Sequence, residues 1–105
     1  MHNRQSLTLR ATTRRPAEFD QFWDSTFAEL RSVPADVTCA ADPLRSTQTV
    51  ATFAVGFTSL GGARIFAWLC LPRERNACPG LLLPPGYSGS PSVPRAWASL
   101  GYAAL

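Results

Sequence analysis

A run of three leucines that ends in two prolines constrains the fold of this 105-residue chain more than any other feature. Gly80 to Leu83 is apolar and predicts a short buried strand. Proline has no N–H to donate to a strand ladder and is poorly tolerated inside a central strand. Pro84 to Pro94 is rich in proline, glycine and serine, which predicts a loop directly after this strand.

The segment after this loop predicts a helix and the beginning of another strand. Arg95 to Leu100 is long enough for a short helix, and Gly101 suits its C-terminal end. Tyr102 to Leu105 then predicts the start of a strand. A strand, loop, helix and strand in this order indicate a parallel β-α-β unit.

Upstream, the hydrophobic period is two, which is typical of strands. From Thr49 apolar residues alternate along one face, and Gly61-Gly62 predicts a two-residue hairpin turn. The return strand, Ala63 to Leu71, is apolar on both faces apart from Arg64, which predicts a strand sandwiched between two layers. The segment 34–48 contains several turn-forming residues and predicts a loop.

A helix precedes the hairpin. Pro16 suits its first position, where a missing N–H costs nothing, and Val33-Pro34 ends it. Its apolar residues recur at helical spacing on one face, which predicts packing against the rest of the domain: they are Phe19, Phe22, Trp23, Phe27 and Leu30. The element order predicts an α/β fold with a mixed sheet flanked by helices and an incomplete sheet.

Composition excludes several classes of protein. Apolar residues make up 46% of the chain and charged residues 16%, a balance typical of a globular domain. No apolar run is long enough for a membrane span, so no membrane is expected. The net charge of +3 comes from the arginines of residues 1–14 and Arg15, which predicts a flexible basic arm over 1–14 and a domain over 15–105. Basic residues on a tail do not make a nucleic-acid surface, so no nucleic-acid partner is expected.

The cysteines do not indicate a metal site or a disulfide framework. Cys39, Cys70 and Cys78 are odd in number and lack paired spacing. Free thiols favour a reducing compartment, so we predict a cytoplasmic protein without a metal or cofactor.

Four stretches of the chain resemble the acetyl xylan esterase and cephalosporin-C deacetylase family of α/β-hydrolases. They are Arg15 to Trp23, Phe57 to Ile65, Pro85-Gly86-Tyr87 and Trp97 to Ala103. The third is similar to the family's His-Gly-Tyr, with Pro85 in place of histidine. The match begins near residue 15 and covers only the N-terminal part of the family's domain.

The resemblance implies an esterase that removes acetyl groups from xylo-oligosaccharides or cephalosporin C with a serine, a histidine and an aspartate. In this superfamily the oxyanion hole takes one backbone N–H from the loop after the third strand. By position, Tyr87 supplies it through its main chain, and Gly86 allows a sharp turn beside the substrate. The catalytic serine, aspartate and histidine are expected downstream, so we predict an inactive chain in isolation. The resemblance also implies a homo-oligomer and a sheet in which the fourth strand lies between the hairpin and the third strand.

Ser88 and His2 are possible catalytic residues by type, but neither has the sequence context that a catalytic serine or histidine requires. Gly86 to Ser90 lacks the last glycine of the G-x-S-x-G pattern, and prolines follow where a helix must begin, so Ser88 is not the predicted nucleophile. His2 is the only histidine and lies in the arm, where no third group holds it in place.

Two alternatives remain. Because prolines replace the family's histidine and strand end, the chain can instead be a non-catalytic domain that associates with a partner or with itself. A different α/β-hydrolase branch, such as a dienelactone hydrolase or peptidase relative, is the third interpretation.

Overall fold

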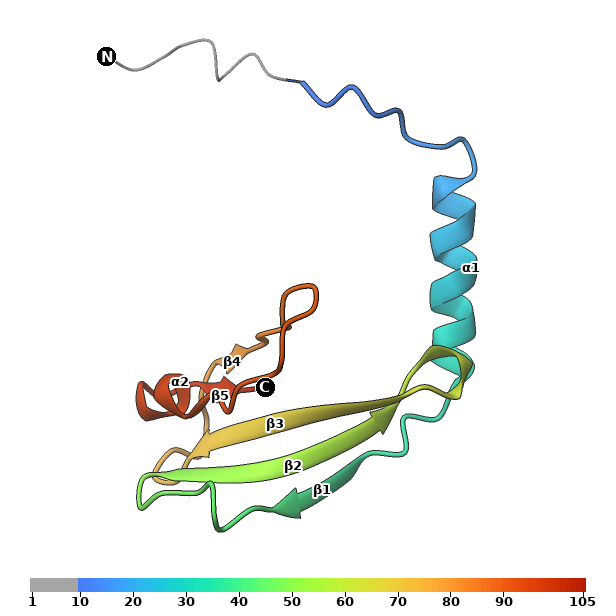
Figure 1. The fold of residues 1–105 in the computed structure, drawn as a ribbon. Coiled ribbons are helices and arrows are strands. Elements are labelled where there is room, and N and C mark those ends of the chain that lie inside the picture. Colours follow the sequence, from blue (N-terminus) through green and yellow to red (C-terminus); the bar gives the residue numbers. More distant parts are fainter. Residues whose placement is uncertain (1–9) are drawn as a thin grey trace, which may run out of the picture. The chain divides into compact units, whose positions relative to one another are not determined.

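The computed structural model describes residues 10–105, so the predicted arm lies largely outside the described residues. The chain divides into two units, one that ends at Ser32 and one that spans Val33–Leu105 (Figure 1). This division falls inside the segment 15–105, and the assignment of that segment to one domain stays a prediction.

The first unit contains helix α1, Phe19–Ser32. The prediction that Pro16 opens the helix is wrong by three residues. Phe19 N–H donates to the Pro16 carbonyl at 3.2 Å, so Pro16 lies in the turn before the helix and supplies an acceptor to it. Neighbouring aromatic rings on α1 contact one another, as Phe22 and Trp23 do with centroids 5.3 Å apart. No residue of α1 is buried, so the predicted packing of its apolar face stays a prediction.

The hairpin of the second unit confirms the period-two alternation. Strands β2, Val50–Thr58, and β3, Arg64–Pro72, pair antiparallel along their whole length, from Val50 opposite Pro72 to Thr58 opposite Arg64. The prediction of a two-residue turn at Gly61-Gly62 is wrong. Leu60–Gly62 forms a short 3₁₀ turn, in which the Gly62 and Ala63 N–H groups donate to the Ser59 and Leu60 carbonyls at 3.2 and 3.3 Å. Both glycines adopt positive φ, and the Ser59 N–H donates to the Ala63 carbonyl at 2.8 Å, so the connection spans Ser59 to Ala63.

The predicted loop 34–48 contains a strand. Strand β1, Thr38–Ala41, pairs antiparallel with β2, with Thr38 opposite Gly56. All four of its residues are exposed, so no hydrophobic alternation marks it in the sequence. The backbone hydrogen bonds of the β2 edge, rather than burial of side chains, define this strand.

The last part of the chain forms β4, Gly80–Leu81, α2, Arg95–Ser99, and β5, Ala103–Ala104. The sheet order is β1-β2-β3-β5-β4, so β5 lies between the hairpin and β4 as expected. β5 is parallel to β4 and antiparallel to β3. The predicted buried strand Gly80 to Leu83 is shorter and more exposed than expected, because Leu82 is 69% exposed.

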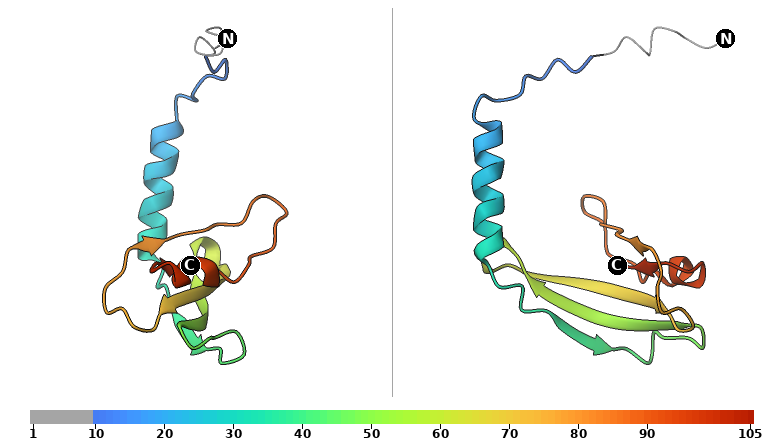
Figure 2. Two further views of the ribbon diagram at one scale, coloured as in Figure 1. Left: turned by 90° about the vertical axis from the view of Figure 1, so that its left-hand side faces the viewer. Right: turned by 180° about the vertical axis from the view of Figure 1, so that it is seen from behind.

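The core lies at one end of the hairpin. Helix α2 contacts β2, β3 and β5, and Figure 2 shows it beside the end of β3. Val50, Cys70 and Ala98 are buried there, and half-buried Val93 packs on them. The prediction that the return strand is covered on both faces is wrong for its first half, where Ile65 and Phe66 are 40% and 52% exposed. The short helix covers only the end of β3 that carries Cys70.

Candidate active site

The candidate loop begins where the ladder between β4 and β5 ends. Leu105 N–H donates to the Leu81 carbonyl at 2.9 Å, and Leu83 N–H donates to the Leu105 carbonyl at 2.8 Å. The next residue is Pro84, which has no N–H. The two prolines therefore follow the last ladder bond and do not interrupt it, and the loop leaves from the carboxyl end of a parallel strand. In open α/β sheets this is the edge where ligands bind.

Residues Gly86 to Gly89 form a closed turn at the tip of the loop. Gly89 N–H donates to the Gly86 carbonyl at 2.8 Å. Ser88 has φ +60°, and a positive φ at the third residue is the mark of a type II turn. A Cβ on Gly89 would lie 2.9 Å from the Gly86 carbonyl oxygen, closer than a side chain allows. The glycine that the turn requires is therefore Gly89.

Gly86 was expected to allow a sharp turn of the backbone, but the structure shows no strained conformation at this residue. Gly86 is absent from the residues with positive φ, and a Cβ built on it meets no atom within 4 Å. Within the second unit, nothing prevents a larger residue there. The sharp change of direction occurs at Ser88 instead, and the role of Gly86 beside a substrate stays a prediction.

Tyr87 occupies the second position of this turn. Its side chain is fully exposed. Among residues 10–105, its N–H donates to no protein acceptor. This follows from the geometry of the turn, since the single turn hydrogen bond uses the N–H of the fourth residue and leaves the amides of the two central residues free. The predicted oxyanion-hole donor is thus an available N–H.

The far end of the loop is attached to the core. Pro94 is buried, and Val93 packs against Val50, Cys70 and Ala98. Arg95 N–H donates to the Val93 carbonyl at 2.9 Å where α2 begins. The loop is therefore held at both ends, by the strand ladder at Leu83 and by the core at Val93, while the residues between them are exposed.

An apolar cavity of about 200 Å³ lies beside the base of the loop. Its walls come from the exposed half of the hairpin, from the loop and from the end of β5: Phe57, Ile65, Phe66, Ala67, Trp68, Leu82, Leu83, Pro84, Pro85, Pro91, Ser92, Pro94 and Leu105. Ser92 is its only polar side chain. The cavity supplies apolar surface to pack against and no acidic, basic or thiol side chain.

Residues 10–105 bring no serine, histidine and aspartate together, because this part of the chain contains no histidine. His2 lies outside the described residues. In the span 10–105, no three histidine, cysteine or acidic side chains are placed to hold a metal ion. In the same span, no helix is both long and apolar enough to cross a membrane.

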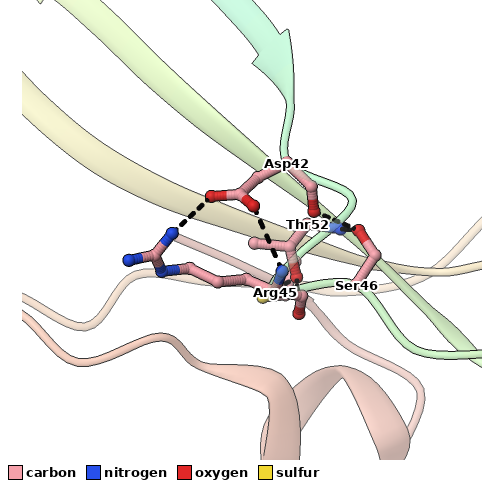
Figure 3. A network of polar contacts seen from close by, with 5 residues as sticks. Asp42, Arg45, Ser46 and Thr52 are labelled. Atoms are coloured by element: carbon pink, nitrogen blue, oxygen red, sulfur yellow. Dashed lines mark hydrogen bonds and ion pairs between the residues drawn. The ribbon is translucent and has the colours of Figure 1, made fainter.

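A second polar cluster, which sequence reasoning missed, joins the loop before β2 to the core (Figure 3). Arg45 pairs with Asp42 at 2.8 Å, and its guanidinium lies 4.7 Å from the centre of the Trp68 ring. Ser46 Oγ bonds to the Asp42 carbonyl, and Thr52 Oγ1 donates to the Arg45 carbonyl at 3.0 Å. Burial raises the pKa of Asp42, but the hydrogen bonds and charge of Arg45 and a backbone hydrogen bond from Leu44 outweigh this and leave that pKa below its ordinary value. The cluster shapes the loop and presents no free nucleophile.

The family model for acetyl xylan esterase (AXE1) matches residues 4–105. Among curated proteins, the acetyl esterase Axe7A of Xylanibacter ruminicola is 27% identical over 78 residues, which covers 74% of this chain and 18% of that protein.

Two solved structures share the fold. Acetyl xylan esterase 1 from Thermoanaerobacterium sp. JW/SL YS485 superposes with a TM-score of 0.81 at 24% identity over 89% of this chain and 30% of that one. Acetyl xylan esterase from Paenibacillus sp. R4 gives a TM-score of 0.79 at 25% identity over 95% of this chain and 33% of that one. These matches confirm the predicted α/β-hydrolase fold class. The chain spans about a third of the length of the solved relatives and about a fifth of the curated one.

Proposed function

Because this chain belongs to the acetyl xylan esterase (AXE1) family, we propose that it forms the N-terminal part of an acetyl ester hydrolase and supplies half of its oxyanion hole. The single observation that supports this role is the free N–H of Tyr87, at the tip of a closed turn after the last ladder bond of β4. The serine, histidine and aspartate of the reaction come from elsewhere in the complete enzyme, and the isolated chain is inactive.

The proposed chemistry is acyl transfer to a serine. When the serine attacks the acetyl carbonyl, the carbonyl oxygen becomes an anion. A backbone N–H that already points at this oxygen stabilises the anion more than the starting ester, and such a donor contributes about 10²–10³-fold to kcat. Tyr87 acts through its main chain, so the identity of its side chain matters less than the presence of its N–H.

We propose acetylated xylo-oligosaccharides as the substrate class and cephalosporin C as a second one. The first is supported by the family description and by the names of the relatives, which are acetyl esterases and acetyl xylan esterases. The second rests on the resemblance of the four sequence stretches alone. In both cases the group removed is a single acetyl.

The test uses the protein purified from its native locus, with its intact mass recorded. We expect hydrolysis of p-nitrophenyl acetate and release of acetate from acetylated xylo-oligosaccharides, with cephalosporin C as a parallel assay. Tyr87→Pro removes the N–H while proline is favoured at the second position of a type II turn. We expect kcat to fall about 10²–10³-fold in this variant.

Tyr87→Ala is the matched control, because it removes the phenol and keeps the N–H. Its kcat should stay within about threefold of the parent, well short of the loss of an oxyanion donor. Equal losses in both variants would show that the side chain matters instead. Absence of any ester hydrolysis by the native protein would contradict the proposed function.

One observation favours the alternative of a non-catalytic domain that associates with a partner or a second copy. The hairpin and the base of the loop expose large apolar side chains, among them Phe66 and Leu82, and patches of this kind are typical of association surfaces. A native mass near 11.4 kDa together with a concentration-dependent oligomer and no esterase activity would support this alternative.

A further inference from the structure

We propose that Ser88 and Gly89 are positioning residues for the Tyr87 N–H, so that the closed turn rather than the tyrosine side chain determines activity. This inference rests on the proposed function. It goes beyond the proposed function by assigning positioning roles to two further residues of the turn.

The first step is the conformation of Ser88. Its φ of +60° lies in the left-handed region, which residues other than glycine and asparagine rarely adopt. In a type II turn this residue sets the orientation of the peptide plane that joins it to the residue before. Here that residue is Tyr87. A change of φ at Ser88 alone to an ordinary negative value would redirect the chain after Ser88 and carry the Gly89 N–H away from the Gly86 carbonyl, so the turn that holds Tyr87 would open.

The second step is the close approach at Gly89. Its N–H donates to the Gly86 carbonyl at 2.8 Å, and a Cβ would lie 2.9 Å from that same oxygen. Because this oxygen belongs to the backbone, it cannot move aside as a flexible side chain would. Any larger residue at 89 must open the turn, and the single hydrogen bond that closes the turn is lost.

The third step is the way the loop is held. Leu83 is bonded to Leu105 at one end, and Val93 packs on the core at the other. Between these points the described chain contains one closing hydrogen bond, from Gly89 to Gly86. The orientation of the Tyr87 N–H thus depends on this turn, and a misplacement of about 1 Å at a reacting group can cost about 10²-fold in rate.

The experiment compares four variants of the native protein in the p-nitrophenyl acetate assay. Ser88→Val disfavours the left-handed conformation and Gly89→Ala introduces the clash. We expect each to lower kcat by about tenfold or more with KM within about twofold, since the donor acts on the transition state and not on the bound ester. Ser88→Gly accepts a positive φ and should therefore recover most of the kcat that Ser88→Val loses. Ser90→Ala changes the same loop outside the turn and should keep the parent kcat.

The affinity for a boronic acid that mimics the tetrahedral intermediate is a second measurement. It separates loss of the oxyanion donor from a general loss of structure, because a general loss would also lower the thermal midpoint. We expect this affinity to fall in Ser88→Val and Gly89→Ala by the same factor as kcat, at an unchanged thermal midpoint. If one of the two variants unfolds, the other is used for the comparison. Hydrogen exchange at the Gly89 amide reports whether the turn has opened.

Two results separate this inference from the proposed function. If Tyr87→Pro lowers kcat but Ser88→Val and Gly89→Ala keep it, the positioning role is overturned and the oxyanion-hole role stands. If Tyr87→Pro leaves kcat unchanged, or if the native protein hydrolyses no ester, both are overturned. Loss of activity in Ser88→Gly equal to that in Ser88→Val would show that the serine hydroxyl matters, which also overturns the inference.

Discussion

Thr52 Oγ1 lies 3.4 Å from Cys70 Sγ in the core, and both side chains are fully buried. The two residues face each other across the β2–β3 hairpin. The same Thr52 hydroxyl donates to the Arg45 carbonyl at 3.0 Å. This contact joins the hairpin core to the loop before β2, and it makes the Cys70 thiol a reporter of local opening.

The three cysteines should react with a thiol reagent in the order of their exposure. Cys39 is exposed on the edge strand β1, Cys78 is half-buried, and Cys70 is buried. We expect Cys39 to react first and Cys70 last, because a buried thiol must wait for the structure to open. Mass spectrometry of the labelled peptides of the native protein over time measures the order. Labelling of Cys70 as fast as Cys39 would contradict the packed core.

Replacing Thr52 with valine should accelerate the labelling of Cys70. Thr52→Val keeps the shape of the side chain but leaves the Arg45 carbonyl without its hydroxyl donor. Loss of an intramolecular hydrogen bond costs about 0.5–1.5 kcal/mol, which corresponds to at least about twofold faster labelling. Thr52→Ser is the control, since it retains the hydroxyl, and it should change the rate less than Thr52→Val.

Asp42 should titrate below its ordinary pKa of 3.8. Burial acts to raise this pKa, and the hydrogen bonds and charge of Arg45, together with a backbone hydrogen bond from Leu44, lower it by more. A depressed folded-state pKa means that the ion pair stabilises the loop above the unfolded-state pKa and that this stabilisation is lost as the pH falls through the folded-state value.

The Arg45 amide reports this titration directly, because its N–H donates to Asp42 Oδ1 at 3.1 Å. We expect the chemical shift of this amide to titrate with a midpoint below 3.8. Arg45→Gln removes the charge and keeps the backbone donor, so its midpoint should be higher than that of the parent. A midpoint that does not depend on the residue at 45 would contradict the assignment of cause.

The 105-residue chain expressed alone should melt without a sharp cooperative transition. Its fully buried apolar core consists of small residues around Val50 and Cys70, while many large apolar side chains, such as Phe66 and Leu82, stay exposed. Burial of apolar area is the main favourable contribution to folding. Because this core is small, we expect the chain alone to be marginally stable or molten. Calorimetry and binding of a hydrophobic dye test this expectation.

A single sharp calorimetric transition of the monomer would contradict it. As a matched control, Phe66→Ser and Leu82→Ser should lower dye binding, because they remove exposed apolar surface. Val50→Ser should raise dye binding instead, since Val50 is 1% exposed and belongs to the core.

Local features of the chain were predictable where the sequence carries a clear period or a backbone constraint. The alternation along β2 predicted the hairpin, and Pro84 marked the end of the ladder after Leu83. The spacing of Phe19, Phe22 and Trp23 predicted α1, although Pro16 proved to lie in the preceding turn. The candidate site was predictable at Tyr87 through the family resemblance, whereas the roles of Ser88 and Gly89 became visible only with their backbone geometry.

The sequence by itself determined the types and order of most elements, because period and proline placement act within a few residues of the chain. Only the tertiary structure decided that Thr38–Ala41 is a strand, that it pairs with the edge of β2, and that β3 meets β5 where Cys70 lies opposite Ala104. These are pairings between residues distant in sequence, and the backbone N–H groups that make them belong to every residue type except proline. A pattern of side chains therefore does not reveal them, and the turn that presents the Tyr87 N–H is closed in the same way, by one backbone hydrogen bond.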